Sequence, residues 1–378
     1  MRALAITCAL AATAHADGDH LTGSWAGARD GLADAGVVFD VTYAAEVFGD
    51  AQHDAPGHEE LLGHLDAAVT LDSERLHLWK GGKLYALVQN NEGHGINRDV
   101  GSATDISNLE AAPYTQLGEL FLEQALGDDV SVRIGKQDAN RDFGTPRFGG
   151  NFINNNFGMF PTSPLPSYPT NGLGASLGVT HGWLAVRAAV YEGSPEVGGL
   201  GLATAFKPHA GYMLAGLLAA TTPFGARDTG TQSIGVWRQH GDLPAVDGSA
   251  RTFEHDAGFY VQLDERFYRH PDTKDESGLT VILRFSWAQA DRTDISRYLG
   301  GSIAYHGLGS RHDDTIGLGV GYFTVAQPVD GSEEFVEAFY KWRLTAYASL
   351  QPDVQVYRHP SGDRRDAVLV GTRLKVKL

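Results

Sequence analysis

The sequence has almost no cysteine. Only Cys8 is present among the 378 residues, and it lies in an N-terminal stretch that has the features of an export signal. The exported chain therefore has no thiol. This excludes disulfides, cysteine nucleophiles and thiolate metal sites from the mature protein.

Basic residues and long apolar runs are also scarce. The chain has 30 lysines and arginines against 46 acidic residues, which gives a formal net charge of −16 at pH 7. Proteins that bind nucleic acids need clustered cations to displace counterions, so this balance predicts no nucleic-acid partner. After the N-terminal stretch, no apolar run approaches the ~20 residues of a transmembrane helix.

The first sixteen residues are predicted to be a cleaved signal peptide. Met1-Arg2 gives a positive start, residues 3–13 form a short apolar run, and Ala14-His15-Ala16 supplies small residues before a cut at Asp17. The alternative is a buried N-terminal helix. The run is too short to span a membrane and ends in a polar stretch, which favours the signal peptide.

Alternation of apolar and polar residues dominates the rest of the chain. In residues 37–47 the odd positions are apolar or small, whereas the even positions include Asp40, Thr42 and Glu46. Successive side chains of a strand point to opposite faces, so this segment has one apolar and one polar face. We find no linker, low-complexity run or charge block that would divide the chain, so one large all-β unit is expected.

About sixteen such segments follow one another, many of them about ten residues long. Short joins such as 127–129 and 180–182 contrast with a long one at 138–171, as in outer-membrane barrels. The pattern predicts a transmembrane antiparallel β-barrel over residues 37–378, preceded by a short N-terminal periplasmic segment at 17–36. In that segment Leu21, Trp25, Leu32 and Ala33 could form a short helix or plug the inner mouth. The expected strand starts are residues 37, 63, 83, 116, 129, 172, 183, 211, 232, 256, 278, 298, 315, 333, 348 and 366.

A soluble β-sandwich would show the same alternation. Three features favour the barrel. The segments are longer than the five or six residues usual in sandwiches, and the last one runs to the terminal residue. Aromatic residues also lie near segment ends, as interfacial girdles would: Tyr43, Phe48, Trp183, Tyr191, Tyr340 and Trp342.

Sixteen strands enclose an aqueous channel, which the polar face would line. The charges of that face have both signs, which would suit a neutral polar solute, although facing charges could simply pair across the wall. These residues are Asp40, Glu46, Glu119, Glu123, Arg133, Arg187, Asp264, Arg266, Arg284, Glu337, Lys341, Arg343, Asp353, Arg373, Lys375 and Lys377.

The long join at 138–171 interleaves arginines and asparagines with phenylalanines. Amide and guanidinium groups hydrogen-bond hydroxyls, and aromatic faces pack on sugar rings, so the segment is predicted to fold inward as a selective constriction loop. Alternatively, its aromatics hold the loop to the wall and its asparagines serve turns. The candidate pore-lining and sugar-binding residues are Glu119, Glu123, Arg133, Lys136, Asp138, Arg141, Asp142, Asn154, Asn155, Asn156, Asp264, Arg266 and Arg284.

Motifs spread over nearly the whole mature chain resemble those of the carbohydrate-selective porins of the OprB type. They include Leu21–Arg29, Arg133–Asp138, Asn155–Gly158, Pro164–Pro169, Asp313–Val320, Ser349–Gln355 and Arg365–Gly371. The resemblance implies a sixteen-stranded barrel in the bacterial outer membrane and passive diffusion of glucose and similar sugars. It implies no cofactor and no enzymatic turnover.

The same resemblance implies neutral sugars as transported solute, outer-membrane lipid as surroundings, and the outer-membrane assembly machinery as a partner. A homo-oligomer is left open, since members of this family have been considered both monomeric and oligomeric. The chain departs from the family at Leu378, where an aromatic residue is usual. This departure puts assembly efficiency in question.

Two other functions are weighed against a sugar porin. One is a general or ion-selective porin, which the mixed lining charges do not exclude. The other is an exported all-β glycoside hydrolase. Glu119 and Glu123 share a strand face, but four residues of strand separate them by ~13 Å, beyond the usual acid–base gap.

A metal site is not predicted. His53, His58 and His64 lie near Glu59 and Glu60, but the spacing does not match the helical zinc motif. They are interpreted as scattered loop histidines.

Overall fold

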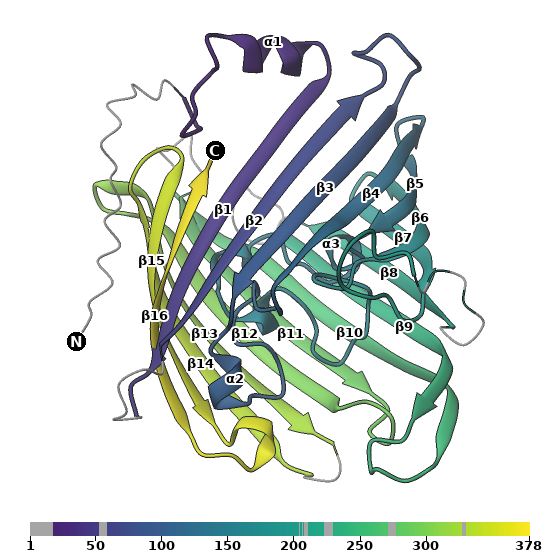
Figure 1. The fold of residues 1–378 in the computed structure, drawn as a ribbon, viewed down its shortest axis with the longest axis vertical. Coiled ribbons are helices and arrows are strands. Elements are labelled where there is room, and N and C mark those ends of the chain that lie inside the picture. The colour runs from purple at the N-terminus through teal and green to yellow at the C-terminus, as the bar shows by residue number, and fades with distance from the viewer. Residues whose placement is uncertain are drawn as a thin grey trace.

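The computed structural model describes residues 18–52, 59–203, 205, 207, 211–222, 230–270, 277–326 and 330–378. Sixteen antiparallel strands close into one barrel (Figure 1), which confirms the predicted fold. The strands are β1 Val37–Asp50, β2 Glu59–Asp72, β3 Gly82–Gly93, β4 Tyr114–Leu126, β5 Val130–Gln137, β6 Gly172–His181, β7 Leu184–Glu192, β8 Tyr212–Thr222, β9 Gly230–Pro244, β10 Thr252–Arg269, β11 Gly278–Ala288, β12 Ile295–Leu308, β13 Arg311–Val325, β14 Ser332–Arg343, β15 Ala348–Arg358 and β16 Ala367–Lys377.

The helices are short. They comprise α1 Ala28–Asp34, α2 Asn97–Val100 and α3 Asn140–Phe143, with 3₁₀ turns at Gly149–Asn151, Asn155–Phe157 and Pro360–Gly362. Within the described residues, no helix has the length and apolar character needed to cross a membrane. The signal peptide predicted for residues 1–16 lies outside the described residues.

Each strand pairs with its sequence neighbours, and the ring closes where β1 meets β16. At this seam Ala44 lies opposite Lys375, and Glu46 lies opposite Arg373. Closure leaves no strand edge, so the sheet can pair its backbone groups within the protein, as a bilayer requires.

The alternation seen in the sequence corresponds to the two faces of the wall. On β1 the even positions point inward, and Glu46 is buried, whereas Tyr43 and Val47 face outward and are more than a third exposed. Large apolar side chains remain exposed all round the outer face, among them Ile134 and Leu299 at about 60 %. A face this apolar is the one that contacts lipid.

Some local predictions were wrong. Three strands begin four residues earlier than predicted, at Glu59, Thr252 and Arg311, because their outermost residues do not alternate in polarity. Phe48 and Tyr191 are not girdle residues, since both point into the barrel and are buried. The ring of Phe48 occupies space left by a glycine opposite it on β16.

The two ends of the barrel differ. One end, here called the short-turn end, has joins such as 127–129 and 182–183, whereas the long-loop end has 94–113, 138–171 and 193–211. Helix α1 lies at the short-turn end, near the C-terminus (Figure 1). Arg29 lies 4.2 Å over the Trp25 ring and donates a hydrogen bond to the Leu378 carbonyl at 3.1 Å. The segment before β1 thus forms a short helix and contacts the end of β16.

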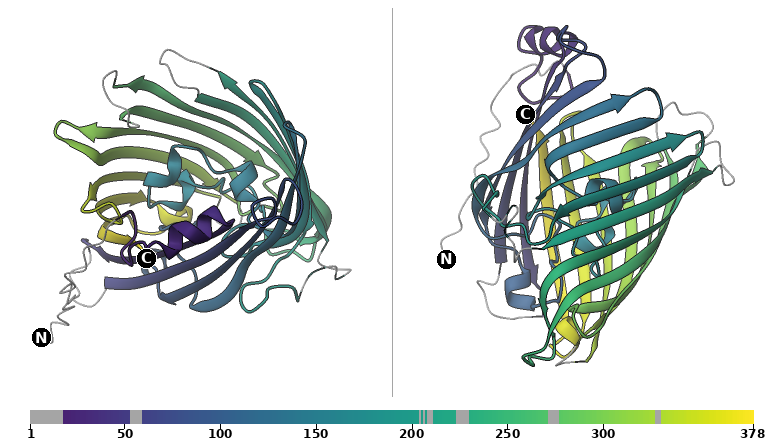
Figure 2. Two further views of the ribbon diagram at one scale, coloured as in Figure 1. Left: turned by 90° about the horizontal axis from the view of Figure 1, so that it is seen from above. Right: turned by 90° about the vertical axis from the view of Figure 1, so that its right-hand side faces the viewer.

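Two loops enter the barrel from the long-loop end (Figure 2). They are residues 138–171, called the inner loop, and residues 94–113, called the α2 loop. The inner loop packs closely against the inward face of β13. A Cβ at Gly319 would lie 2.2 Å from the Phe157 ring, so only glycine permits this approach.

Where the inner loop leaves the barrel wall, backbone groups of β4 find hydrogen-bond partners outside the sheet. β5 ends at Gln137, so the first residues of β4 have no β5 partner. Instead, Leu117 N donates to Gly199 O at 2.8 Å, and the Lys136 ammonium donates to the carbonyls of Leu117 and Leu200 at 2.8 and 3.1 Å. Backbone groups that the missing strand would have paired are thereby satisfied.

We expect Gly319→Ala to destabilise the barrel by about 1–3 kcal/mol, because the added methyl group overlaps the Phe157 ring. Urea unfolding of the protein refolded in detergent measures this change. Gly216→Ala is the matched control, since its Cβ would meet Val236 at an ordinary 3.4 Å. Equal midpoints for the two variants would contradict close packing of the inner loop on β13.

Candidate functional site

A buried arginine holds the inner loop to the side of the barrel opposite β5, where the loop begins. Arg284 of β11 donates hydrogen bonds to the carbonyls of Gly144, Asn156 and Met159 at 2.8, 2.8 and 3.0 Å. Its guanidinium also lies 3.8 Å from the centre of the Phe160 ring. One cation therefore satisfies three loop carbonyls that would otherwise be buried without donors.

A carboxylate of β14 holds the middle of the same loop. Glu337 accepts hydrogen bonds from the backbone nitrogens of Ile153 and Asn154 at 2.7 and 3.0 Å. The Asn154 amide in turn donates to Gln355 and to the hydroxyl of Tyr357, at 3.0 and 2.6 Å. The inner loop thus crosses the lumen and is bound to β11, β14 and β15.

A ladder of charges fixes the root of the inner loop on β4, β5 and β7. Arg133 bonds Glu123 through two nitrogens, at 3.1 and 2.7 Å, and bonds Asp142 at 2.6 Å. Asp142 accepts a further bond from Arg187 at 2.9 Å. Alternating signs along this ladder leave each charge with an opposite neighbour.

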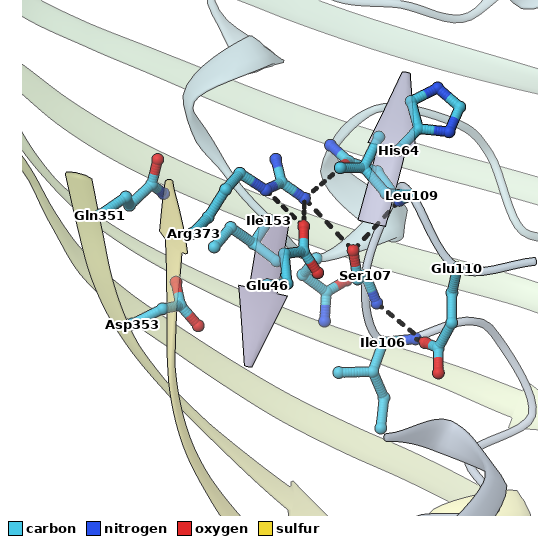
Figure 3. Close-up of polar contacts among 12 residues, drawn as sticks. Glu46, His64, Ile106, Ser107, Leu109, Glu110, Ile153, Gln351, Asp353 and Arg373 are labelled. Atoms are coloured by element: carbon cyan, nitrogen blue, oxygen red, sulfur yellow. Dashed lines mark hydrogen bonds and ion pairs between the residues drawn. The ribbon is translucent and has the colours of Figure 1, made fainter. Parts of the chain in front are cut away.

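The α2 loop is held at the barrel seam (Figure 3). Arg373 of β16 pairs with Glu46 of β1 and donates to Ser107 Oγ at 3.2 Å and Asn108 Oδ1 at 2.7 Å. Within the loop, the Glu110 carboxylate accepts backbone hydrogen bonds, including one of 2.9 Å from Ile106 N. This network gives the loop a fixed shape beside the inner loop.

Cavities of about 390 and 210 Å³ lie between the loops and strands β9–β15. Another open space lies between these loops and the wall formed by β16, β1, β2 and β3. It consists of two adjoining cavities of about 360 and 280 Å³. Each is comparable in size to a small-molecule pocket. We call the space the channel cleft, and define it by the residues that line both cavities: Thr42, His64, Asp66, Leu109, Asp138, Tyr168 and Lys375.

Charges of both signs face the channel cleft. Asp66 of β2 is 38 % exposed and accepts hydrogen bonds from Gln89 and the His64 ring. Lys375 of β16 is exposed and has no hydrogen-bond or ion-pair partner among the described residues. Arg141 of the inner loop pairs with Glu119 yet keeps 43 % of its side chain exposed. The cleft therefore offers both donors and acceptors to a solute.

Aromatic rings complete the lining. Tyr85 of β3 stacks on Phe121 with ring centres 5.0 Å apart, and Arg141 lies over the Tyr85 ring at 5.2 Å. On the other side Tyr168 meets the His64 ring edge-on at 5.2 Å and donates its hydroxyl proton to Leu109 O at 2.8 Å. These contacts fix both tyrosine rings in place.

Burial, followed by the negative charge of Glu119, raises the pKa of the Asp138 carboxyl to about 7. Asp138 is the first residue of the inner loop, and Asn140 N donates to its Oδ1 at 2.8 Å. The carboxyl is therefore neutral below pH ~7 and charged above it.

The structure separates the thirteen residues predicted from the sequence into distinct places. Glu119, Asp138, Arg141 and Asn155 line one or both cavities of the channel cleft. The ladder and the loop attachments contain Glu123, Arg133, Asp142, Asn154, Asn156, Asp264, Arg266 and Arg284. Some of the predicted residues thus face open space, whereas others attach the inner loop to the wall.

The prediction that Lys136 lines the pore was wrong. Lys136 lies opposite Leu120 on the outward parity of β5 and is buried against residues 117 and 200, so it does not line the pore. Its position follows from Ile134, two residues earlier, which is exposed on the outer face.

His64 was also misjudged, because it is not a loop residue. It lies inward on β2 and hydrogen-bonds Asn91 as well as Asp66. The sequence analysis did not include His64, Asp66, Tyr85 or Tyr168 among the candidate site residues. The inward parity of β2 and β3 indicated that His64, Asp66 and Tyr85 would face the lumen. Among the described residues, no group of three His, Cys, Asp or Glu side chains could hold a metal ion. His53 and His58 lie outside them.

Comparison with known proteins gives a family match over most of the chain. The model of the carbohydrate-selective porin family, OprB, matches residues 60–378. A search of curated protein sequences gives no significant match.

Solved structures share the fold. The high-pH structure of Pseudomonas putida OprB superposes with a TM-score of 0.85 at 16 % identity, covering 96 % of this chain and 99 % of that chain. The low-pH structure of the same protein gives 0.66 at 14 % identity, with the same coverage. A loop-deletion form of OmpT from Vibrio cholerae gives 0.54 at 12 % identity, covering 91 % of this chain and all of that chain.

We expect Arg284→Met to release the inner loop while the barrel stays closed. Three carbonyls lose their donor, at a cost of about 1–3 kcal/mol for each one that stays buried. Single-channel conductance should rise as the lumen widens, and the band shift on heating during electrophoresis reports the closed barrel. Arg75→Met at the short-turn end is the control. Unchanged conductance would show that Arg284 does not hold the loop.

Lowering the pH from 8 to 6 should move ion selectivity towards anions, because the Asp138 carboxyl, with a pKa of about 7, becomes neutral. Reversal potentials in a salt gradient measure this selectivity. In Asp138→Asn the shift should be smaller, since the residue no longer titrates. An identical shift in the variant would assign the effect to other groups.

Proposed function

This chain belongs to the carbohydrate-selective porin family, OprB, and we propose that sugars such as glucose cross it through the channel cleft. The observation that carries this proposal is the opposed, solvent-accessible charge of Asp66 and Lys375 beside fixed tyrosine rings. Both charged groups line both cavities, so a solute in the cleft lies within reach of them.

Transport is passive in this mechanism. A sugar entering the cleft exchanges water hydrogen bonds for bonds to carboxylate acceptors and ammonium or guanidinium donors. A single sugar hydroxyl can donate to Asp66 and accept from Lys375 or Arg141. Because these contacts replace those with water, the solute is held weakly enough to leave.

Tyr85 supports selectivity for a ring-shaped solute. Its stacking on Phe121 and its contact with Arg141 fix the plane of the ring. A fixed aromatic face can pack against the apolar C–H face of a sugar without paying further ordering entropy. Arg141 lies where it could contact the hydroxyls of such a sugar.

The orientation in the outer membrane follows from the lengths of the joins. Outer-membrane barrels have short periplasmic turns and longer extracellular loops. We therefore place the short-turn end and residues 17–36 in the periplasm, after removal of a signal peptide at residues 1–16. The outer-membrane assembly machinery would insert the chain, and a homo-oligomer is compatible with this placement.

We propose no catalytic role. Glu119 and Glu123, the carboxylates considered for glycoside hydrolysis, are paired with Arg141 and Arg133. Neither is left as a free acid or nucleophile facing a bound sugar.

Substitution of the opposed charges should reduce sugar preference. In liposome-swelling assays we expect Asp66→Asn and Lys375→Gln each to lower the swelling ratio of glucose to an amino acid of similar size. A decrease of about fivefold corresponds to loss of one hydrogen bond of about 1 kcal/mol. The amino acid rate alone should change little, since the barrel and inner loop remain.

Lys83→Gln provides the matched control, because Lys83 lies on the inward parity of β3 but outside the channel cleft. Equal glucose and amino acid rates in the unmodified protein would favour a general diffusion porin. A preference set by charge sign, and not by hydroxyl content, would favour an ion-selective one.

A further inference from the structure

The lipid-facing side of the barrel carries two arginines without partners. Arg238 of β9 and Arg297 of β12 are exposed, and neither has a hydrogen bond or ion pair among the described residues. Both point outward, since they share the parity of Val236 and Leu299, which are 55 % and 60 % exposed. Unpaired cations are unexpected on the apolar face of a protein whose net charge is −16.

Apolar and aromatic side chains fill the surface between the two arginines. Arg238 lies opposite Ala257 of β10, and Arg297 lies opposite Trp287 of β11. Phe259 of β10 adjoins Trp287, with ring centres 6.0 Å apart. We call these five residues the outer patch. Three inter-strand spacings separate its arginines, or ~14 Å across the sheet.

The aromatic residues of the outer patch indicate that it lies at the depth of lipid headgroups. Aromatic girdles mark the membrane–water interface of outer-membrane barrels. Phe259 and Trp287 are exposed aromatics on the outer face, Arg297 adjoins Trp287, and Arg238 lies two residues nearer the long-loop end than the residue opposite Phe259. With the long loops outside the cell, as proposed above, this depth belongs to the outer leaflet.

We propose that the outer patch binds a phosphate-bearing lipid of the outer leaflet. The guanidinium groups of Arg238 and Arg297 bind phosphate oxygens, for which their planar donor pairs are well suited. Acyl chains of the same lipid pack on Phe259 and Trp287. Without such an anion, two cations would lie unpaired beside a surface that is otherwise apolar, which is unfavourable.

The two arginines of the outer patch differ from another exposed arginine of the outer face, which has an acidic partner. Arg358 of β15 is also exposed on the outer face, but Glu334 of β14 lies 3.6 Å from it and neutralises it within the protein. Asp242 of β9 lies two outward positions beyond Arg238 and already has an interaction of its own. The outer patch itself contains no acid, so its charge is positive.

Native mass spectrometry of the detergent-solubilised protein tests the proposal, with diphosphorylated lipid A as the probe and phosphatidylglycerol and phosphatidylcholine as comparisons. Each of Arg238→Gln and Arg297→Gln should weaken lipid A binding about fivefold, and the double variant about 25-fold. Arg358→Gln, the matched control, should change it less than about twofold. Glucose-driven liposome swelling should be unchanged in all variants, which reports intact folding.

Four results would overturn the proposal. One is unchanged lipid A binding in the double variant, and another is an equal loss in Arg358→Gln, which would indicate a general charge effect. The third is tighter binding of phosphatidylglycerol than of lipid A, since the patch would then not select the outer-leaflet lipid. A change in oligomeric state without a change in lipid binding also contradicts it, because the patch would then contact a second copy of the chain.

Discussion

Backbone hydrogen bonding is the constraint on which the rest of this structure depends. A sheet exposed to hydrocarbon must pair every N–H and C=O internally, and closing β1 onto β16 achieves this. The constraint becomes acute where the inner loop leaves the wall after Gln137. There Gly199 takes the place of a strand neighbour for Leu117, and the Lys136 ammonium caps two carbonyls. The inner loop can thus leave the wall and constrict the lumen because residues 199 and 136 satisfy the backbone groups that it leaves without strand partners.

The position of the open space is a consequence of where the inner loop is bound. Arg284 and Glu337 hold the loop against one half of the barrel, and Gly319 lets it approach the strand backbone. The channel cleft therefore lies off centre, against β16 and β1–β3. Most inward-facing charges on the half of the barrel that binds the loop form hydrogen bonds or ion pairs that hold it. Those opposite it, such as Asp66 and Lys375, remain accessible to water.

Strand alternation predicted the barrel, its sixteen strands and the inner loop, because the face on which a side chain lies is a local property of the sequence. It did not predict which charges pair, since that depends on contacts between residues far apart in the chain, such as Glu46 with Arg373. Lys136 shows a second limit. Its parity indicated the outer face, but the segment that covers a lysine there comes from more than sixty residues away. Asp66 and His64 were missed because a strand position alone does not reveal what a loop leaves uncovered.

The seam has a consequence for quality control during assembly. Thr42 of β1 and Lys375 of β16 belong to the channel cleft, and they come together only when the first and last strands join. Arg373 at the same seam holds the α2 loop through Ser107 and Asn108. A barrel arrested before closure would have neither the cleft nor its loop in place. Selective permeation through the cleft therefore requires that β1 and β16 are joined.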